Sequence, residues 1–191
     1  MDLFNFNSPN PAKAGKILIS QPFLSDPNFE RSIILLCAHD DAGSFGFVLN
    51  KPLDATFSEI IDGFETLDLP VYNGGPVQQD VINYIHRFPD LMGAVSIAEG
   101  IYMGGDLDHL RELHSLGGCT KDQIRFFLGY SGWSEGQLEA ELEEKAWIVT
   151  NRVDESFIFI TDPAEMWRKA MAGLGGRFVH YSNYPSDPRL N

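Results

Sequence analysis

The stretch RSIILLCAHDDAGSFGFVLN, residues 31–50, decides the fold. Residues 31–38 and 44–50 are continuous apolar runs rich in β-branched and aromatic side chains, and the polar segment 39–43 between them ends in Gly. This pattern predicts an antiparallel hairpin. Because both strands are apolar on both faces, each face needs a cover, and we expect helices or a second sheet layer to supply it.

Helices and strands are interspersed along the rest of the chain. Helix starts are predicted by the capping pairs Thr56/Glu59 and Ser134/Gln137, by Asp106, and by Asp162 followed by Pro163. Further strands are expected at 16–20, 71–73, 81–88, 101–103, 123–130, 146–150 and 157–161. No G-x-G-x-x-G follows a strand, which argues against a doubly wound sheet. The sequence therefore predicts an α+β fold, a mixed sheet flanked by about four helices.

Length and charge limit the class of protein. The 191 residues favour one domain spanning 1–191, with an N-terminal arm at 1–14 and an extended tail at 181–191. Fourteen Lys and Arg against 27 Asp and Glu give a net charge of −13, which repels phosphate backbones. Direct nucleic-acid binding is therefore not expected.

Cysteine usage and hydropathy point to the cytoplasm. Cys37 and Cys119 form no C-x-x-C pair, and neither has the Cys/His spacing of a zinc site. No apolar run approaches the ~20 residues that span a bilayer, and the first six residues lack a basic flank. We expect a cytoplasmic protein without membrane association, and no metal or cofactor is predicted.

Three loop segments are the candidate binding elements. Asn50 and Lys51 end the second hairpin strand, where the ammonium group could hold an anion. Asn73, Gly74 and Gly75 end another strand, where backbone N–H groups could form an anion nest, although a tight strand exit is the simpler interpretation. A third segment carries aromatic rings that could wall a pocket or merely pack over a helix; it contains Tyr130, Ser131, Gly132 and Trp133.

Two other functions remain open from the residues. Gly129-Tyr130-Ser131-Gly132-Trp133 has Trp where a nucleophile elbow needs its second Gly, so no catalytic residue is assigned. An unfamiliar enzyme could still use Ser131 or Tyr130 with a spatially adjacent His86, His109 or Asp106. Alternatively, the glutamate-rich segment 135–144 could bind a basic protein partner.

The chain resembles the bacterial AlgH/YqgE family. The matching segments, which cover nearly the whole chain, are GKILIS at 15–20, NFxRS at 28–32, GFVLNKP at 46–52, NGGPV at 73–77, GGD at 104–106 and GYSGWxxGQLxxE at 129–141, where x marks a position that does not carry the match. The resemblance implies a single α+β domain whose mixed sheet divides and curls toward a partial barrel. It also implies a regulatory role in transcription, although the sequence has no helix-turn-helix signature for direct DNA contact.

The leading hypothesis is a non-catalytic protein that binds a small anionic ligand or a protein partner. In it, Lys51 holds the anion, Gly74 and Gly75 donate N–H groups, and Tyr130 and Trp133 form apolar walls of one shared pocket. This pocket requires the three strand ends to meet on one edge of the sheet. The residues predict neither the ligand's identity nor an oligomeric state.

Overall fold

The fold is an α+β arrangement of one large sheet and six helices among the described residues. A computed structural model describes residues 10–150 and 154–184. Its strands are β1 (Ile17–Ser20), β2 (Ile33–Asp40), β3 (Gly43–Val48), β4 (Pro52–Thr56), β5 (Pro70–Asn73), β6 (Val77–His86), β7 (Val95–Ala98), β8 (Ile101–Met103), β9 (Ile124–Ser134) and β10 (Trp147–Thr150). Its helices are α1 (Phe57–Ile60), α2 (Leu107–Ser115), α3 (Gln137–Glu143), α4 (Glu155–Ile160), α5 (Pro163–Gly173) and α6 (Phe178–Tyr181).

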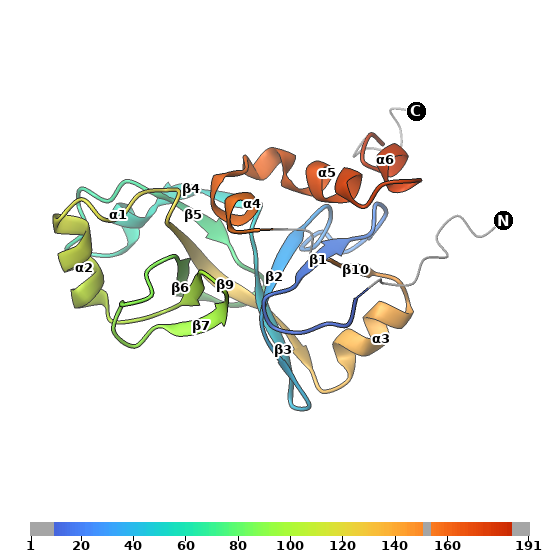
Figure 1. The fold of residues 1–191 in the computed structure, drawn as a ribbon, viewed down its shortest axis with the longest axis horizontal. Helices are drawn as coiled ribbons and strands as arrows, with labels where there is room; N and C mark the ends of the chain where they lie inside the picture. The colour runs from blue at the N-terminus through green and yellow to red at the C-terminus, as the bar shows by residue number, and fades with distance from the viewer. Residues whose placement is uncertain (1–9, 151–153, 185–191) are drawn as a thin grey trace.

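The sheet is mixed and divides at its longest strand, β9. The strand order is β10-β1-β2-β3-β9-β6-β8-β7, and β5, which also pairs with β4, adds to β9 in parallel. The first half of β9 pairs with β5 and β6, while its second half pairs with β3 (Figure 1). The predicted fold class, a mixed sheet that divides, is confirmed.

The predicted hairpin is present and is covered on both faces. On β2, Ile33, Leu35 and Cys37 contribute to one hydrophobic cluster, and Ile34 and Leu36 contribute to another. Alternation of this kind follows from the two-residue period of a strand. Helices α4 and α5 pack on the first cluster, and α3 packs on the second. A third cluster lies under α1 and α2, so β9 reaches three cores through Phe127, Trp133 and Phe126.

The sheet curls toward a barrel without closing. A Cβ built on Gly15, just before β1, would lie 2.8 Å from the Cβ of Ala98 in β7. The segment before β1, the strand next to the edge strand β10, therefore lies close to β7 at the other edge of the sheet, yet among the described residues no ladder joins β1 to β7. Helix α5 covers one end of this open barrel, and the β2–β3 hairpin extends beyond the other (Figure 1).

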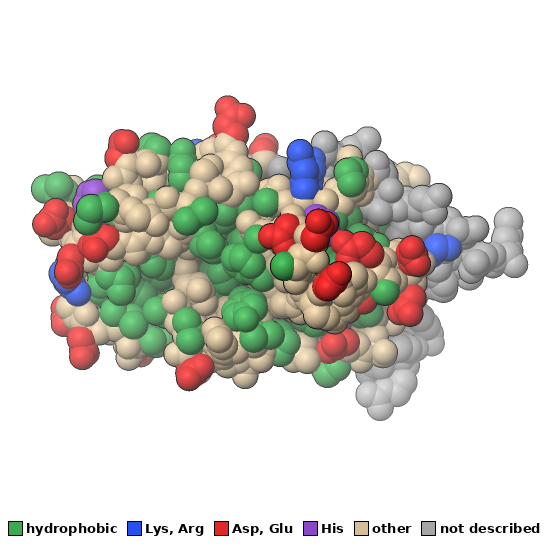
Figure 2. Space-filling view, turned by 90° about the horizontal axis from the view of Figure 1, so that it is seen from below, with side chains coloured by type: hydrophobic (Ala, Val, Ile, Leu, Met, Phe, Trp, Pro, Cys, Tyr) green, Lys and Arg blue, Asp and Glu red, His purple; other side chains and the backbone are tan. Residues whose placement is uncertain are grey.

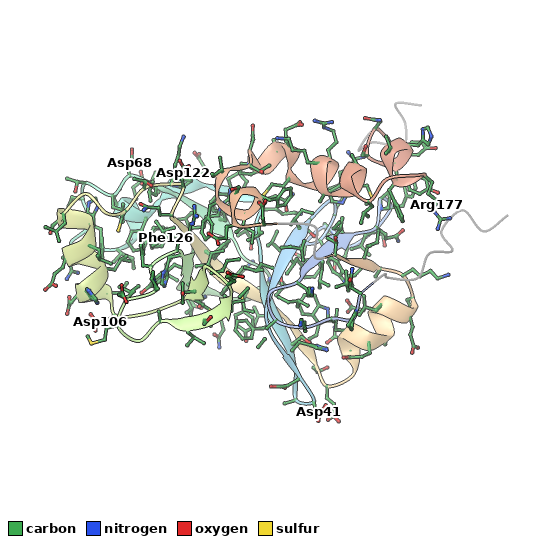
Figure 3. The ribbon with its side chains drawn as sticks, viewed as in Figure 1. Asp41, Asp68, Asp106, Asp122, Phe126 and Arg177 are labelled. Carbon is green, nitrogen blue, oxygen red and sulfur yellow. The ribbon has the colours of Figure 1, made fainter. Side chains whose placement is uncertain are left out.

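Three helix starts behave as the sequence predicts. Asp106 accepts a hydrogen bond from the N–H of His109, and Asp162 accepts one from the N–H of Ala164. Thr56 and Glu59 form the capping box of α1, although that helix is only four residues long. Figure 3 labels Asp106 at the start of α2. The fourth start is shifted, because Ser134 still belongs to β9 and α3 begins at Gln137.

Several sequence expectations are wrong. Residues 157–161 were predicted as a strand but lie in α4, where Asp154 caps the N–H of Phe157. A short apolar run fits either a strand or a buried helix turn, and here the cap decides. Strands β4 and β7 and helix α6 were not predicted. The expected extended tail begins with helical turns at 182–184, and residues 185–191, like 1–9 of the arm, lie outside the described part.

No helix in the described part of the chain has the length and hydropathy needed to cross a bilayer.

Candidate functional site

The candidate binding residues lie at two ends of β3 and do not share one pocket. Trp133 pairs with Ser44 at the start of β3, whereas Asn50 and Lys51 follow its end. The first end borders an open cavity of about 760 Å³, and the second borders a separate cavity of about 450 Å³ with no lining residue in common. The predicted single pocket is therefore wrong, because β3 runs between its two halves.

The larger cavity, which we call the barrel mouth, opens at the end of the barrel opposite α5. Its wall contains apolar and aromatic side chains, and its rim carries a few polar ones. The apolar liners include Ala38, Phe45, Phe47, Val77, Met103 and Tyr130, and the polar ones include Asp40, Ser44, Gln78 and Asn83. The Phe45 and Tyr130 rings meet edge to face with centroids 6.0 Å apart. Figure 2 views this end, with hydrophobic side chains across the centre of the face and acidic ones on its protruding part.

Two of the predicted aromatic residues differ in what they do at the mouth. Tyr130 lines the cavity and packs against the barrel core. Trp133 borders the same cavity, but its indole belongs to the cluster under α3 and its Nε1 donates to Glu141 Oε2 at 2.8 Å. Gly132 also borders the mouth. The mouth liners Phe45, Val77 and Met103 were not predicted, because they lie on three different strands.

Gly74 and Gly75 form a tight junction between strands. The N–H of Gly74 donates to Leu128 O at 2.9 Å, and the N–H of Gly75 donates to Asn73 Oδ1 at 3.0 Å. Ser131 is fully buried, and its Oγ donates to Gly74 O at 3.0 Å. Both N–H groups are therefore used inside the protein, as the simpler interpretation of a tight strand exit predicts, and not for the anion of the shared-pocket hypothesis.

Asn50 and Lys51 stand at the covered end of the barrel, beside α5. The Asn50 side chain accepts from Ile33 N and donates to Arg31 O, both at 2.9 Å. Lys51 Nζ donates to Pro27 O at 3.1 Å. Burial lowers the pKa of Lys51, while the nearby carboxylates of Glu30 and Asp26 act in the opposite direction. We call this cavity, which Arg31 also lines, the Arg31 cavity.

The catalytic alternative finds no geometric support. Among the described residues, Ser131 and Tyr130 have no hydrogen bond to a histidine. The Nε2 of His86 bonds Gly104 O at 2.8 Å and its Nδ1 accepts from Phe88 N at 3.1 Å. His109 Nδ1 accepts from Met92 N. These histidines hold the backbone in place.

A different serine and histidine do meet. Ser44 Oγ lies 2.7 Å from His39 Nδ1, and His39 Nε2 lies 3.5 Å from a Glu139 carboxylate oxygen. Ser44 and His39 are cross-strand partners in the hairpin, and α3 supplies Glu139. Because both ring nitrogens of His39 are engaged in this way, we interpret the arrangement as a structural link between the hairpin and α3. In the described part of the chain no cluster of His, Cys, Asp and Glu could hold a metal ion.

Buried His86 should make the protein sensitive to mild acid. It is fully buried, and desolvation lowers its pKa below the ordinary value despite the opposing bond to Gly104 O. Because the pKa of His86 is lower in the folded state than in the unfolded state, unfolding takes up protons as the pH falls through the unfolded value of about 6.5. Stability should therefore fall as pH drops from 7 to 5.5.

The measurement is the urea midpoint of unfolding at the two pH values. His86→Gln should have a smaller loss between them, whereas exposed His180→Gln should behave like the parent. Equal losses in all three proteins would contradict the assignment to His86.

Fold and cavities together define an α+β open-barrel protein with a ligand-sized cavity at each end of β3. Residues 17–179 match the family model described as AlgH-like, and the chain belongs to this family.

Relatives match along the whole chain. A UPF0301 protein of Cytophaga hutchinsonii is 44% identical over 179 residues, 93% of this chain and 98% of the relative. A UPF0301 protein of Bacteroides thetaiotaomicron is 39% identical over 100% of this chain and 97% of its own. These names state no activity.

Solved structures share the fold. The AlgH protein from Pseudomonas aeruginosa, a UPF0301 protein, is 29% identical with a TM-score of 0.70, over 95% of this chain and 98% of that one. Protein DIP2367 from Corynebacterium diphtheriae has a TM-score of 0.79 at 22% identity, over 95% and 97% of the two chains. At this identity, the similarity to DIP2367 shows a common fold and nothing more.

Proposed function

We propose that the protein is a non-catalytic binding protein whose barrel mouth takes a small uncharged or cationic molecule with an aromatic or aliphatic body. The observation that carries this is the cavity of about 760 Å³ lined by Phe45, Phe47 and Tyr130. Ligand sites of about 300–1,000 Å³ with mainly apolar walls and a few polar groups are typical of small-molecule binding, and barrel mouths are a common place for them.

Charge at the mouth selects against anions. Asp40 is the one charged side chain among its liners, and the chain carries a net charge of −13. The turn of the β2–β3 hairpin adds Asp41 at the same end, as Figure 3 labels it. A negative rim disfavours an anionic ligand and attracts a cationic one. The small anion expected from the sequence therefore does not suit the mouth.

Regulation through a protein partner is part of this proposal. A ligand in an open mouth stays partly exposed and alters the surface that a partner meets. Helix α3 follows β9 directly in the sequence, and on or beside this helix lie the exposed carboxylates of Glu135, Glu143 and Glu144. A basic partner would be complementary in charge to this surface. Two free thiols fit a cytoplasmic location.

Three probes that share one ring test the mouth. Indole is neutral, tryptamine is cationic and indole-3-acetate is anionic at pH 7. We expect tryptamine to bind best and indole-3-acetate worst, with amide chemical shifts moving at Phe45, Val77 and Gly132. Val77→Trp fills the mouth and should weaken tryptamine at least about tenfold, which is about 1.4 kcal/mol.

Two controls separate the mouth from the rest of the surface. Val179→Trp changes an exposed valine on α6 and should leave binding intact. Asp40→Asn should remove most of the preference for tryptamine over indole, because Asp40 is the one charged liner of the mouth. The preference itself should be small, since an exposed charge pair contributes only about 0.2–1 kcal/mol. Shifts scattered over the surface, or unchanged affinity in Val77→Trp, would overturn the proposal.

A further inference from the structure

The Arg31 cavity lies at the other end of β3 and has the opposite charge character. It is about 450 Å³ and is walled by the chain before β2, the end of β3 and the first turns of α5. Three of its liners are cations, Arg31, Lys51 and Arg168, and two are acids, Glu30 and Glu165. An excess of cations in one cavity is notable in a chain with a net charge of −13.

Two of these cations form no ion pair within the described residues. Arg168 is already paired with Glu165. By contrast, within residues 10–150 and 154–184, neither Arg31 nor Lys51 has a carboxylate oxygen within 4.0 Å of its side-chain nitrogens. Lys51 donates to a backbone carbonyl, and Arg31 donates through Nη2 to Tyr184 O. The described chain therefore holds neither Arg31 nor Lys51 in an ion pair, although Glu30, which lines the same cavity, and Asp26 act on the Lys51 charge from beyond that distance.

The guanidinium of Arg31 is held in place and still incompletely bonded. It stacks over the Trp167 ring with its Cζ 4.9 Å from the centroid, and Trp167 is fixed by its own bond to Ser20 O at 3.0 Å. Its Nε is buried and has no hydrogen-bond partner among the described residues. Buried donors are nearly always paired, so an orphan on a charged group indicates a missing acceptor nearby.

The backbone of Arg31 is also strained. Its φ is +48°, a region that non-glycine residues adopt rarely. The Asn50 side chain bonds Arg31 O and Ile33 N and so fixes this turn from the opposite strand. Strain of about 1–3 kcal/mol persists only where surrounding contacts hold it, and it concentrates at functional sites. Asn50 is therefore a positioning residue for Arg31.

We propose that the Arg31 cavity binds the phosphate group of a small phosphomonoester, with Arg31 and Lys51 as its charged contacts. Arg31 and Lys51 form no ion pair in the described chain, and together they suit a phosphate monoester, which carries about −1.5 to −2 charges at pH 7. The fork of an arginine fits phosphate in a bidentate manner, and lysine adds a point charge. A cavity of about 450 Å³ leaves room for the esterified group beside the phosphate.

The test uses the full chain and isothermal titration with three probes at constant ionic strength. Glycerol 3-phosphate should bind, inorganic phosphate should bind more weakly, and acetate, a monoanion, should bind least. Lys51→Gln should weaken glycerol 3-phosphate about tenfold, as should Arg31→Asn, which removes the guanidinium while tolerating a positive φ. Lys13→Gln, at an exposed lysine outside the cavity, should bind like the parent.

A gain of affinity excludes the trivial explanation of misfolding. Glu165→Gln removes a cavity carboxylate and frees Arg168, so it should bind glycerol 3-phosphate more tightly than the parent. Equal binding in the parent, Lys51→Gln and Glu165→Gln would overturn the proposal, as would an absence of binding by folded parent protein. Preference for acetate over both phosphates would assign the cavity to carboxylates instead.

Discussion

Gly75→Ala should prevent stable folding, with a loss of more than about 4 kcal/mol in the free energy of unfolding. A Cβ at this position would lie 2.3 Å from the carbonyl carbon of Tyr130 and 2.4 Å from the backbone nitrogen of Ser131. These are backbone atoms of the central strand β9, which cannot move without disturbing its pairing with β3 and β6. The φ of +147° adds strain for any L side chain.

The matched control is Gly136→Ala. Gly136 also has a positive φ, +70°, but a Cβ there would meet nothing within 4 Å. It should lose only the backbone cost of roughly 1–2 kcal/mol. The measurement is the urea midpoint, or the soluble fraction on expression if Gly75→Ala cannot be purified. Equal effects of the two substitutions would show that the junction tolerates a side chain.

The junction also explains why the sequence left two interpretations of this segment open. Two consecutive glycines are compatible with an anion nest and with a tight approach of two strands. Deciding between them requires knowing that Gly74 lies against Gly129 of a strand more than fifty residues away. No local pattern contains that pairing, so the fold had to be known before the role of the glycines.

Elements with strong local signals were predictable. The hairpin at 31–50 and the caps at Asp106 and Asp162 each depend on nearby residues, and all are present. Helix α4 was misread because the apolar run of Phe157 to Ile160 fits either period. The predicted single site is split into two for a similar reason. Lys51 follows β3 and Tyr130 lies in β9, and only the register of β3 against β9 shows that the two residues are at opposite ends of β3.

The sequence contains only a weak indication that Arg31 belongs to a site. It is a charged residue at the head of an apolar run, and the family segment NFxRS contains it. Its strained backbone, its stacking on Trp167 and its orphan Nε appear only in three dimensions. A charged residue beside a buried strand therefore needs its packing partners before a role can be assigned.

Glu141→Ala should lower the free energy of unfolding by about 3 kcal/mol. The substitution leaves two buried donors without an acceptor, and each unpaired donor costs about 1–3 kcal/mol. Its Oε2 accepts from Nε1 of Trp133 at 2.8 Å and from Nε1 of Trp147 at 2.7 Å. This one carboxylate thus ties β9 and β10 to α3. At about 2–4 °C per kcal/mol for a chain of this size, the midpoint of thermal unfolding should fall by about 6–12 °C.

The control on the same helix is Glu143→Ala, at an exposed position, which should change stability by less than about 0.5 kcal/mol. Trp133→Phe and Trp147→Phe each remove one donor and keep an aromatic ring against Phe29. In double-mutant cycles with Glu141→Ala, each should show a coupling energy of at least about 0.5 kcal/mol, because groups that share one network are not additive. Additive losses in both cycles would mean that the carboxylate acts through helix α3 alone and that the indole bonds contribute no net stability.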